Sequence, residues 1–242
     1  MQPSQVPVRY PSGVTTDAPF QALANYGFRN PFFYHEWEDD FDCVNAIYTQ
    51  TKTTGTIAAL AGDGGQVKFT TAATANDLTS IQLPAASFSF TAGKKSFFLC
   101  RLQVDDATNA EFNVGLMETT ATPFAPTDGL YFKKAAGAIA LVLASMKGSA
   151  ETDIVIPAVV NPLANATSID LAWYVDRKQN VYAFVGSQLV GFVNQNTATI
   201  GPQASGTPVL TAANLAFTLA VGTAAATAHN MTVDFAMAAK ER

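Results

Sequence analysis

Charged residues are scarce in this sequence. Asp, Glu, Lys and Arg make up 14% of its 242 residues, whereas about 25% is usual for soluble globular proteins. The net charge is −5 at pH 7, so the chain has neither the basic excess of a nucleic-acid-binding protein nor the basic patch that holds a protein on an anionic membrane. We therefore expect no nucleic acid and no membrane among its partners, and a surface that is covered by partners or solvated by Thr, Ser and Asn.

Cysteine, histidine and long apolar runs are scarce as well. Cys43 and Cys100 form no CxxC pair, so no disulfide framework is expected. A zinc site of three or four nitrogen and sulfur ligands would need both His35 and His229 together with distant residues. The longest apolar run, around residues 138–144, is far shorter than the roughly 20 residues that cross a bilayer. The first residues also lack a signal-peptide pattern, so we expect cytoplasmic synthesis with reduced thiols.

Calcium is the remaining metal to consider. Asp105, Asp106, Asn109 and Glu111 offer the clustered oxygen ligands that Ca²⁺ prefers. The same residues also form an ordinary polar loop between two strands, which is the interpretation we favour. The sequence therefore predicts no metal site and no cofactor.

The apolar residues that are present recur with a period of two. Successive side chains of a strand leave on opposite faces, so this alternation predicts half-buried antiparallel strands. It is found in residues 96–104, 111–117, 169–176 and 231–237. Turn sequences such as Asp63-Gly64-Gly65 and Asp128-Gly129 separate strands of this kind. Residues 135–145 are rich in Ala and Leu, but Gly137 favours a strand there over a helix. We expect an all-β fold, an antiparallel two-sheet β-sandwich, over residues 41–242.

The first forty residues have a different composition. Prolines are spread through them, so no helix can run far, and the many aromatic residues are atypical of a flexible linker. We interpret residues 1–40 as an extended arm that lies in a groove of its own domain or of a neighbour. The residues expected to contact the partner are Tyr10, Phe20, Tyr26, Phe28, Phe32, Phe33, Tyr34 and Trp37.

One acidic cluster in this segment deserves a test as an active site. If residues 35–40 form a strand, Glu36, Glu38 and Asp40 share one face, and glycoside hydrolysis needs two carboxylates close together. Some jelly-roll glycosidases carry Glu-x-Asp-x-Glu in mid-sheet, whereas this sequence has Glu-x-Glu-x-Asp ahead of the first confident strand. We therefore favour a solvated acidic turn, and we expect no enzyme and no catalytic residue.

Several stretches resemble virion structural proteins of tailed bacteriophages. The resemblance covers about residues 30–242. Its motifs are Thr54-Gly55-Thr56-Ile57, Gly62-Asp63-Gly64-Gly65, Thr70-Thr71, Thr74–Asp77, Phe98–Val104, Asn113–Leu116, Thr127–Phe132, Leu215–Thr218, Thr232–Phe235 and Lys240–Arg242. This resemblance implies a lectin-like (concanavalin-like) jelly roll that acts as a capsid decoration or cement subunit. Its implied partner is the major capsid protein, its implied location is the outer capsid surface after synthesis in the host cytoplasm, and it is expected to be a homo-oligomer, with a dimer favoured over a trimer.

A carbohydrate-binding jelly roll on the virion surface, mediating host adsorption, is the alternative, and its partner would be a glycan. Trp37 would then stack on a sugar ring, although we favour docking of the arm. Trp173 continues the face of Ile169 and Leu171, so we expect it in the core.

Overall fold

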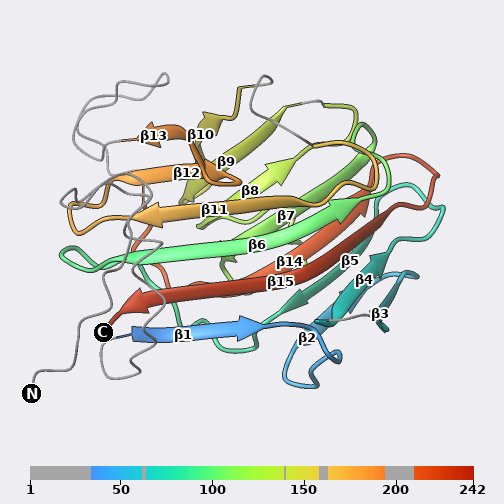
Figure 1. Cartoon of the computed structure of the whole chain (residues 1–242), viewed down its shortest axis with the longest axis horizontal. Helices are drawn as coiled ribbons and strands as arrows, with labels where there is room; N and C mark the ends of the chain where they lie inside the picture. The colour runs from blue at the N-terminus through green and yellow to red at the C-terminus, as the bar shows by residue number, and fades with distance from the viewer. Residues whose placement is uncertain (1–33, 62–63, 139, 158–162, 194–209) are drawn as a thin grey trace, which may run out of the picture.

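The computed structural model describes residues 34–61, 64–138, 140–157, 163–193 and 210–242. Within these ranges every regular element is a β-strand, and no helix is long and apolar enough to cross a membrane. The strands form two antiparallel sheets, A and B, packed face to face (Figure 1). The predicted all-β, two-sheet sandwich is therefore confirmed.

Sheet A is built around the long strand β15. In spatial order it contains β13 (Gln188–Val193), β12 (Val181–Val185), β11 (Ile169–Val175), β6 (Ser96–Val104), β15 (Asn230–Glu241), β4 (Gln66–Thr70) and β3 (Thr56–Leu60). β1 (Tyr34–Asp39) also pairs with β15, along residues 236–241, whereas β4 pairs along residues 230–233. Because β6 takes the other edge of β15, β1 and β4 lie one after the other on the same edge.

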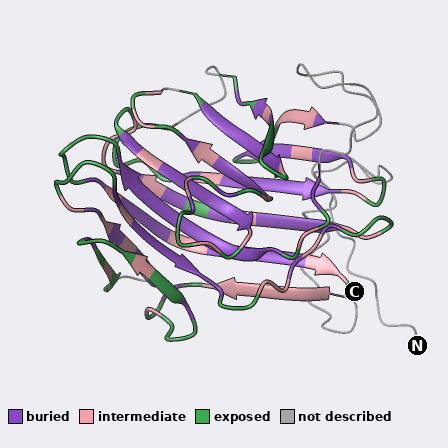
Figure 2. Cartoon of the chain, turned by 180° about the vertical axis from the view of Figure 1, so that it is seen from behind, coloured by how far each residue is buried: buried purple, intermediate pink, exposed green. Residues whose placement is uncertain are grey.

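Sheet B lies behind sheet A in Figure 1. Its order is β10 (Ala150–Val155), β9 (Leu141–Lys147), β8 (Gly129–Lys134), β7 (Ala110–Met117), β14 (Ala216–Thr223), β5 (Asp77–Gln82) and β2 (Thr49–Lys52). The central strands are buried along almost their whole length, as the purple ribbons of Figure 2 show. Both faces of the central part of sheet B are therefore covered.

Two sequence expectations differ from the structure in their boundaries. The sandwich begins at Tyr34, because the last residues assigned to the arm form β1, so the boundary at residue 41 was too late. The predicted strand at 135–145 is present only from Leu141, because Gly137 has a φ of 72° and lies in the turn between β8 and β9. A φ of this sign suits glycine and a hairpin turn.

The core fills the space between the two sheets. Trp173 is fully buried, as predicted, with its ring stacked on Phe98 at 5.9 Å and edge-on to Phe90 at 5.8 Å. Phe217 of sheet B lies 6.0 Å from Phe98 and 6.3 Å from Tyr48, so aromatic rings connect the two sheets. Full burial of a side chain of this size contributes about 1.5–3 kcal/mol.

Candidate interaction surface

β1 carries the two predicted contact residues that fall within the described part of the chain. Tyr34 and Trp37 both lie on this strand, and all its residues are half-buried. The other predicted contact residues lie outside the described residues, and their role stays a prediction. They are Tyr10, Phe20, Tyr26, Phe28, Phe32 and Phe33.

Trp37 points inward, toward the core. Its Nε1 donates a hydrogen bond to the Tyr48 hydroxyl (3.0 Å), and that hydroxyl donates to Asp39 Oδ2 (2.7 Å). Burial, and then the hydrogen bond to Asp39, raise the pKa of Tyr48 far above its usual value. Trp37 is therefore an anchor that fixes β1 to the sandwich, and its half-buried ring packs against the core.

The favoured interpretation of the acidic residues as a solvated turn is wrong, because residues 34–39 form the half-buried strand β1 through their pairing with β15. Glu36 pairs with Ala239 and Glu38 with Met237, so the two carboxylates share the outer face of sheet A. Asp40 does not join them, because β1 ends at Asp39 and the next residue but one, Phe41, has a φ of 52°. The strand also lies at an edge of sheet A, where β15 is the described strand that pairs with it.

The outer face of sheet A is apolar and aromatic. We call it the outer aromatic face, and its members alternate with the core residues of the same strands. Its buried residues are Phe97, Ala172, Tyr174, Phe184 and Ala239, and its half-buried residues are Tyr34, Leu99, Tyr182 and Met237. The rings of Tyr174 and Tyr182 lie 5.8 Å apart, and Phe192 lies 4.8 Å from Tyr182. Edge strand β1 thus extends this face through Tyr34.

Charged pairs border the outer aromatic face. Arg101 makes a two-pronged contact with Asp170 (2.7 and 3.1 Å) and approaches Asp234 at 3.7 Å. Arg177 pairs with Glu241, near the end of β15. A polar border around an apolar centre is the usual arrangement of a protein–protein interface.

The outer face of sheet B is covered by the chain itself. The segment 118–128, between β7 and β8, is held by Gln82, whose Nε2 donates to Glu118 O (3.2 Å) and whose Oε1 accepts from Thr120 N (3.1 Å). Asn113 Nδ2 donates to Pro123 O (2.8 Å). A Cβ at Gly222 would lie 2.8 Å from the ring of Phe124, so this glycine lets the ring approach the sheet.

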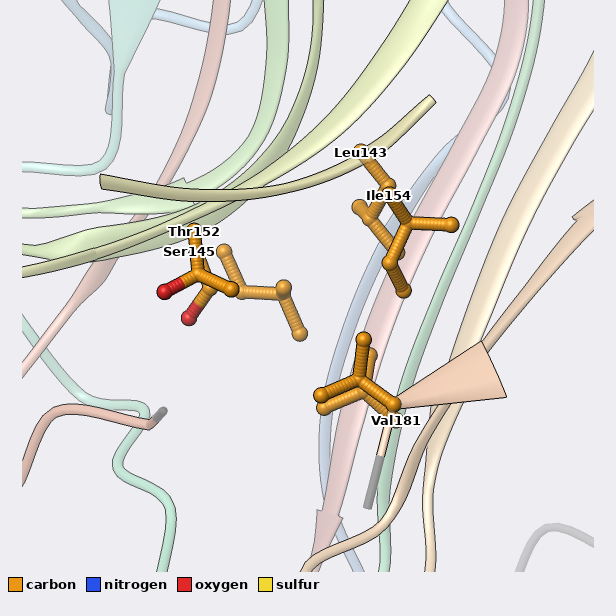
Figure 3. A pocket seen from close by; sticks show the side chains of 7 residues that line it. Leu143, Ser145, Thr152, Ile154 and Val181 are labelled. Carbon is orange, nitrogen blue, oxygen red and sulfur yellow. The ribbon is translucent and has the colours of Figure 1, made fainter. Parts of the chain in front are cut away.

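A small pocket opens between the sheets near β10 and β13. Figure 3 shows Leu143, Ile154 and Val181 around it, with the hydroxyls of Ser145 and Thr152 at one end. The cavity volume is about 10 Å³, which is enough for roughly one water molecule. A sugar ring or a drug-sized ligand does not fit there, since ligand pockets usually measure about 300–1,000 Å³.

The carboxylate of Asp106 in the loop considered for calcium is occupied by hydrogen bonds from the loop itself. Asp106 accepts from Thr108 N (2.8 Å), Asn109 N (3.0 Å) and Asn109 Nδ2 (2.7 Å), and the bonds from Asn109 lower its pKa. Asp105 Oδ2 accepts from Asn230 Nδ2 (2.8 Å). Across the described ranges, no group of three or more His, Cys, Asp or Glu residues is placed to hold a metal ion.

Comparisons with known proteins address the fold. No protein-family model matches the sequence, and no curated protein matches it. Among solved structures, the chain is similar to a protein of unknown function from Shewanella oneidensis MR-1, with 12% identity, 95% of each chain covered and a TM-score of 0.57. It is also similar to an endo-1,3-β-glucanase from Streptomyces sioyaensis, with 15% identity, 88% of this chain and 99% of that chain covered, and a TM-score of 0.59.

A third similar structure is the carbohydrate recognition domain of Emp47p, with 9% identity and a TM-score of 0.56. The match covers 88% of this chain and 98% of that chain. At such low identity these likenesses concern the fold and leave the activity open. They confirm the predicted class: the chain is an antiparallel two-sheet β-sandwich of the concanavalin-like jelly-roll type.

Proposed function

We propose that this chain is a virion structural protein, a capsid decoration or cement subunit that binds the assembled lattice of major capsid protein on the outer capsid surface. The observation that carries the proposal is the half-buried part of the outer aromatic face, which consists of Tyr34, Leu99, Tyr182 and Met237 and reaches the sheet edge at Tyr34. Residues 1–33, with their six predicted contact residues, join the sandwich at this point. Face and arm can thus act as one continuous binding surface.

The physical logic of a cement protein agrees with this arrangement. A protein that binds the assembled lattice and not its free subunits adds its binding free energy to the stability of the shell. A rigid sandwich loses little conformational entropy on binding, and β1 is firmly held by the Trp37–Tyr48–Asp39 chain of hydrogen bonds. The sequence resemblance described above supports the same function.

Cosedimentation with capsids tests the proposal. Capsids assembled from the major capsid protein of the same phage genome are mixed with the full chain and with a variant that lacks residues 1–33. We expect saturable binding of the full chain at a fixed ratio, with increased heat resistance of the shell, and at least about tenfold weaker binding of the variant. If the deletion leaves binding unchanged, residues 1–33 do not contribute to the capsid contact. If the full chain does not bind, the proposed capsid function is rejected.

Substitutions on the folded domain give a matched pair. Tyr182→Ser on the outer aromatic face should weaken capsid binding, because hot spots are commonly aromatic side chains in the interface centre. Val155→Ser, at an exposed position of β10 in the other sheet, should leave binding unchanged. Equal effects of the two substitutions would show that the outer aromatic face is not the contact surface.

Carbohydrate binding is the second candidate. It is favoured by the fold shared with a carbohydrate recognition domain and a glucanase, and by the half-buried rings of Tyr182 and Phe192, with Asp176 Oδ2 3.3 Å from the Tyr182 hydroxyl. A glycan array probed with the same preparation distinguishes the two candidates. A clear glycan signal that Tyr182→Ser abolishes, without capsid binding, would support this function instead.

A further inference from the structure

Strand β3 is an open edge of sheet A. It pairs with β4 along one side, and no described strand pairs with its other side. Four of its five residues are exposed. β3 and β2, which ends sheet B, close the same end of the sandwich (Figure 1), and this end is coloured mainly green in Figure 2. Among the described strands, none occupies the second side of β3, and its mostly exposed residues make this side a candidate for pairing with another strand.

The sequence of β3 lacks the features that normally block strand pairing. Natural edge strands carry charges, prolines or bulges that prevent association with other chains. β1 has Glu36, Glu38 and Asp39, β10 has Glu151 and Asp153, and β13 is joined to β12 with a register irregularity. β3 reads Thr-Ile-Ala-Ala-Leu, with no charge, no proline and a regular register to β4.

The start of β3 is held firmly. The buried carboxylate of Asp77 accepts hydrogen bonds from Thr54 N (3.1 Å), Thr54 Oγ1 (3.1 Å) and Ala72 N (2.6 Å). At Gly55 a Cβ would lie 2.3 Å from Thr70 O, so the chain passes very close to β4 as it enters β3. An edge that is already ordered loses little conformational entropy when a partner strand is added.

We propose that β3 pairs antiparallel with β3 of a second copy of this chain, which makes a two-fold dimer with a continuous sheet A. With Ala58 facing Ala58, Thr56 faces Leu60 and Ile57 faces Ala59. No like charges are opposed, whereas the same pairing at β1 or β10 would bring carboxylates together. Lys68, opposite Ala58 on β4, stays about 14 Å from its symmetry mate over three strand spacings, beyond the screening length of about 8 Å.

Apolar side chains at the same end of the sandwich favour a second copy as the occupant. Leu60 is 37% exposed and Ile47, just before β2, is 46% exposed. In a two-fold contact each copy offers the same patch to the other, so one self-complementary surface is sufficient. Ile57 already packs against the core, and pairing would cover its open side.

A charge placed at the centre of the contact tests the proposal. In the monomer, Ala58→Glu sets a carboxylate opposite Lys68, which is a favourable cross-strand pair. In the dimer it sets two carboxylates opposite each other across the two-fold axis. Like-charge juxtaposition at an interface costs several kcal/mol, so we expect the dimer dissociation constant to rise by more than about 100-fold. The matched control, Val155→Glu, adds the same charge at an exposed position of the β10 edge.

Sedimentation velocity of the full chain gives the readout. The unmodified protein should have about twice the 25.5 kDa mass of one chain, Ala58→Glu should be monomeric with an unchanged thermal midpoint, and Val155→Glu should stay dimeric. A mixture of Ala58→Glu and Ala58→Lys should recover the dimer. A monomeric unmodified protein, a dimeric Ala58→Glu protein, or loss of the dimer in both glutamate variants would overturn the proposal. None of these measurements depends on capsid binding.

Discussion

At the residue scale, Asp77 shows how one buried carboxylate determines the path of the chain. Its side chain is only 2% exposed, and it satisfies donors on both sides of the β3–β4 hairpin, at Thr54 and at Ala72. Buried donors that lose their acceptor cost about 1–3 kcal/mol each. The open edge of sheet A therefore depends on a side chain that belongs to sheet B.

We expect Asp77→Ala to lower the free energy of unfolding by about 2–4 kcal/mol, because it leaves the Thr54 and Ala72 donors without an acceptor. Urea denaturation followed by tryptophan fluorescence measures this change. Asp40→Ala serves as the control, since Asp40 is exposed and surface substitutions usually stay within about 0.5 kcal/mol. Similar losses in both variants would contradict this role of Asp77.

Glu241 gives a prediction about pH. Hydrogen bonding to Arg177, together with the bond from Lys95 N, lowers the pKa of the Glu241 carboxyl. A lowered carboxyl pKa adds stability above the unfolded value near 4.3, and this contribution is lost as the pH falls through the folded pKa. We therefore expect Glu241→Gln to lower the thermal midpoint at pH 7, with a smaller difference at pH 3.

Glu111 should behave in the opposite way and is the natural comparison. Burial is the main cause that raises the pKa of its carboxyl, so its contribution is favourable at acid pH and is lost as the pH rises through the folded pKa. The difference in midpoint between Glu111→Gln and the unmodified protein should therefore be more positive at pH 7 than at pH 3. A pH trend of the same sign for both variants would refute this assignment.

At the scale of the elements, the period-two pattern located several strands well. β6, β7, β11 and β15 lie where alternation predicted them. β14 carries the same signal, since Phe217, Leu219 and Val221 alternate with smaller residues, although the sequence analysis did not use it. β1 was missed because its acidic residues favoured a solvated turn, and because its partner, β15, lies about 200 residues away in the sequence.

The segment 118–128 is the element for which a single contact is easiest to test. Gln82→Ala removes the hydrogen bonds to Glu118, Thr120 and Thr218, so we expect a loss of about 1–3 kcal/mol in unfolding free energy. Hydrogen exchange at the Thr120 amide should accelerate at least about tenfold, because its acceptor is gone.

Gln50→Ala, at an exposed position of β2, provides the control for this experiment. It should leave both the exchange rate and the stability unchanged. Slow exchange at Thr120 in the Gln82→Ala protein would mean that segment 118–128 is held on sheet B by other contacts.

At the scale of the whole molecule, the architecture could be predicted and the site only in part. The alternation of apolar residues and the turn residues were sufficient to predict a two-sheet sandwich, because both patterns reflect the local geometry of strands and turns. The inward direction of Trp37 could have been read from its alternation with Glu36 and Glu38, had the segment been recognised as a strand. The openness of β3 could not be predicted, since it depends on which strands lie beside it after folding.

The central position of β15 has a consequence for how the protein is made. Its residues 230–241 pair with β6, β4 and β1, so three strands synthesised earlier have no central partner until the last strand of the sandwich leaves the ribosome. Contacts between residues so far apart in sequence slow folding, and unpaired strands are exposed to aggregation in the meantime. Sheet A can therefore be completed only once β15 has been synthesised, and chaperones that hold unpaired strands should bind this chain before β15 is in place.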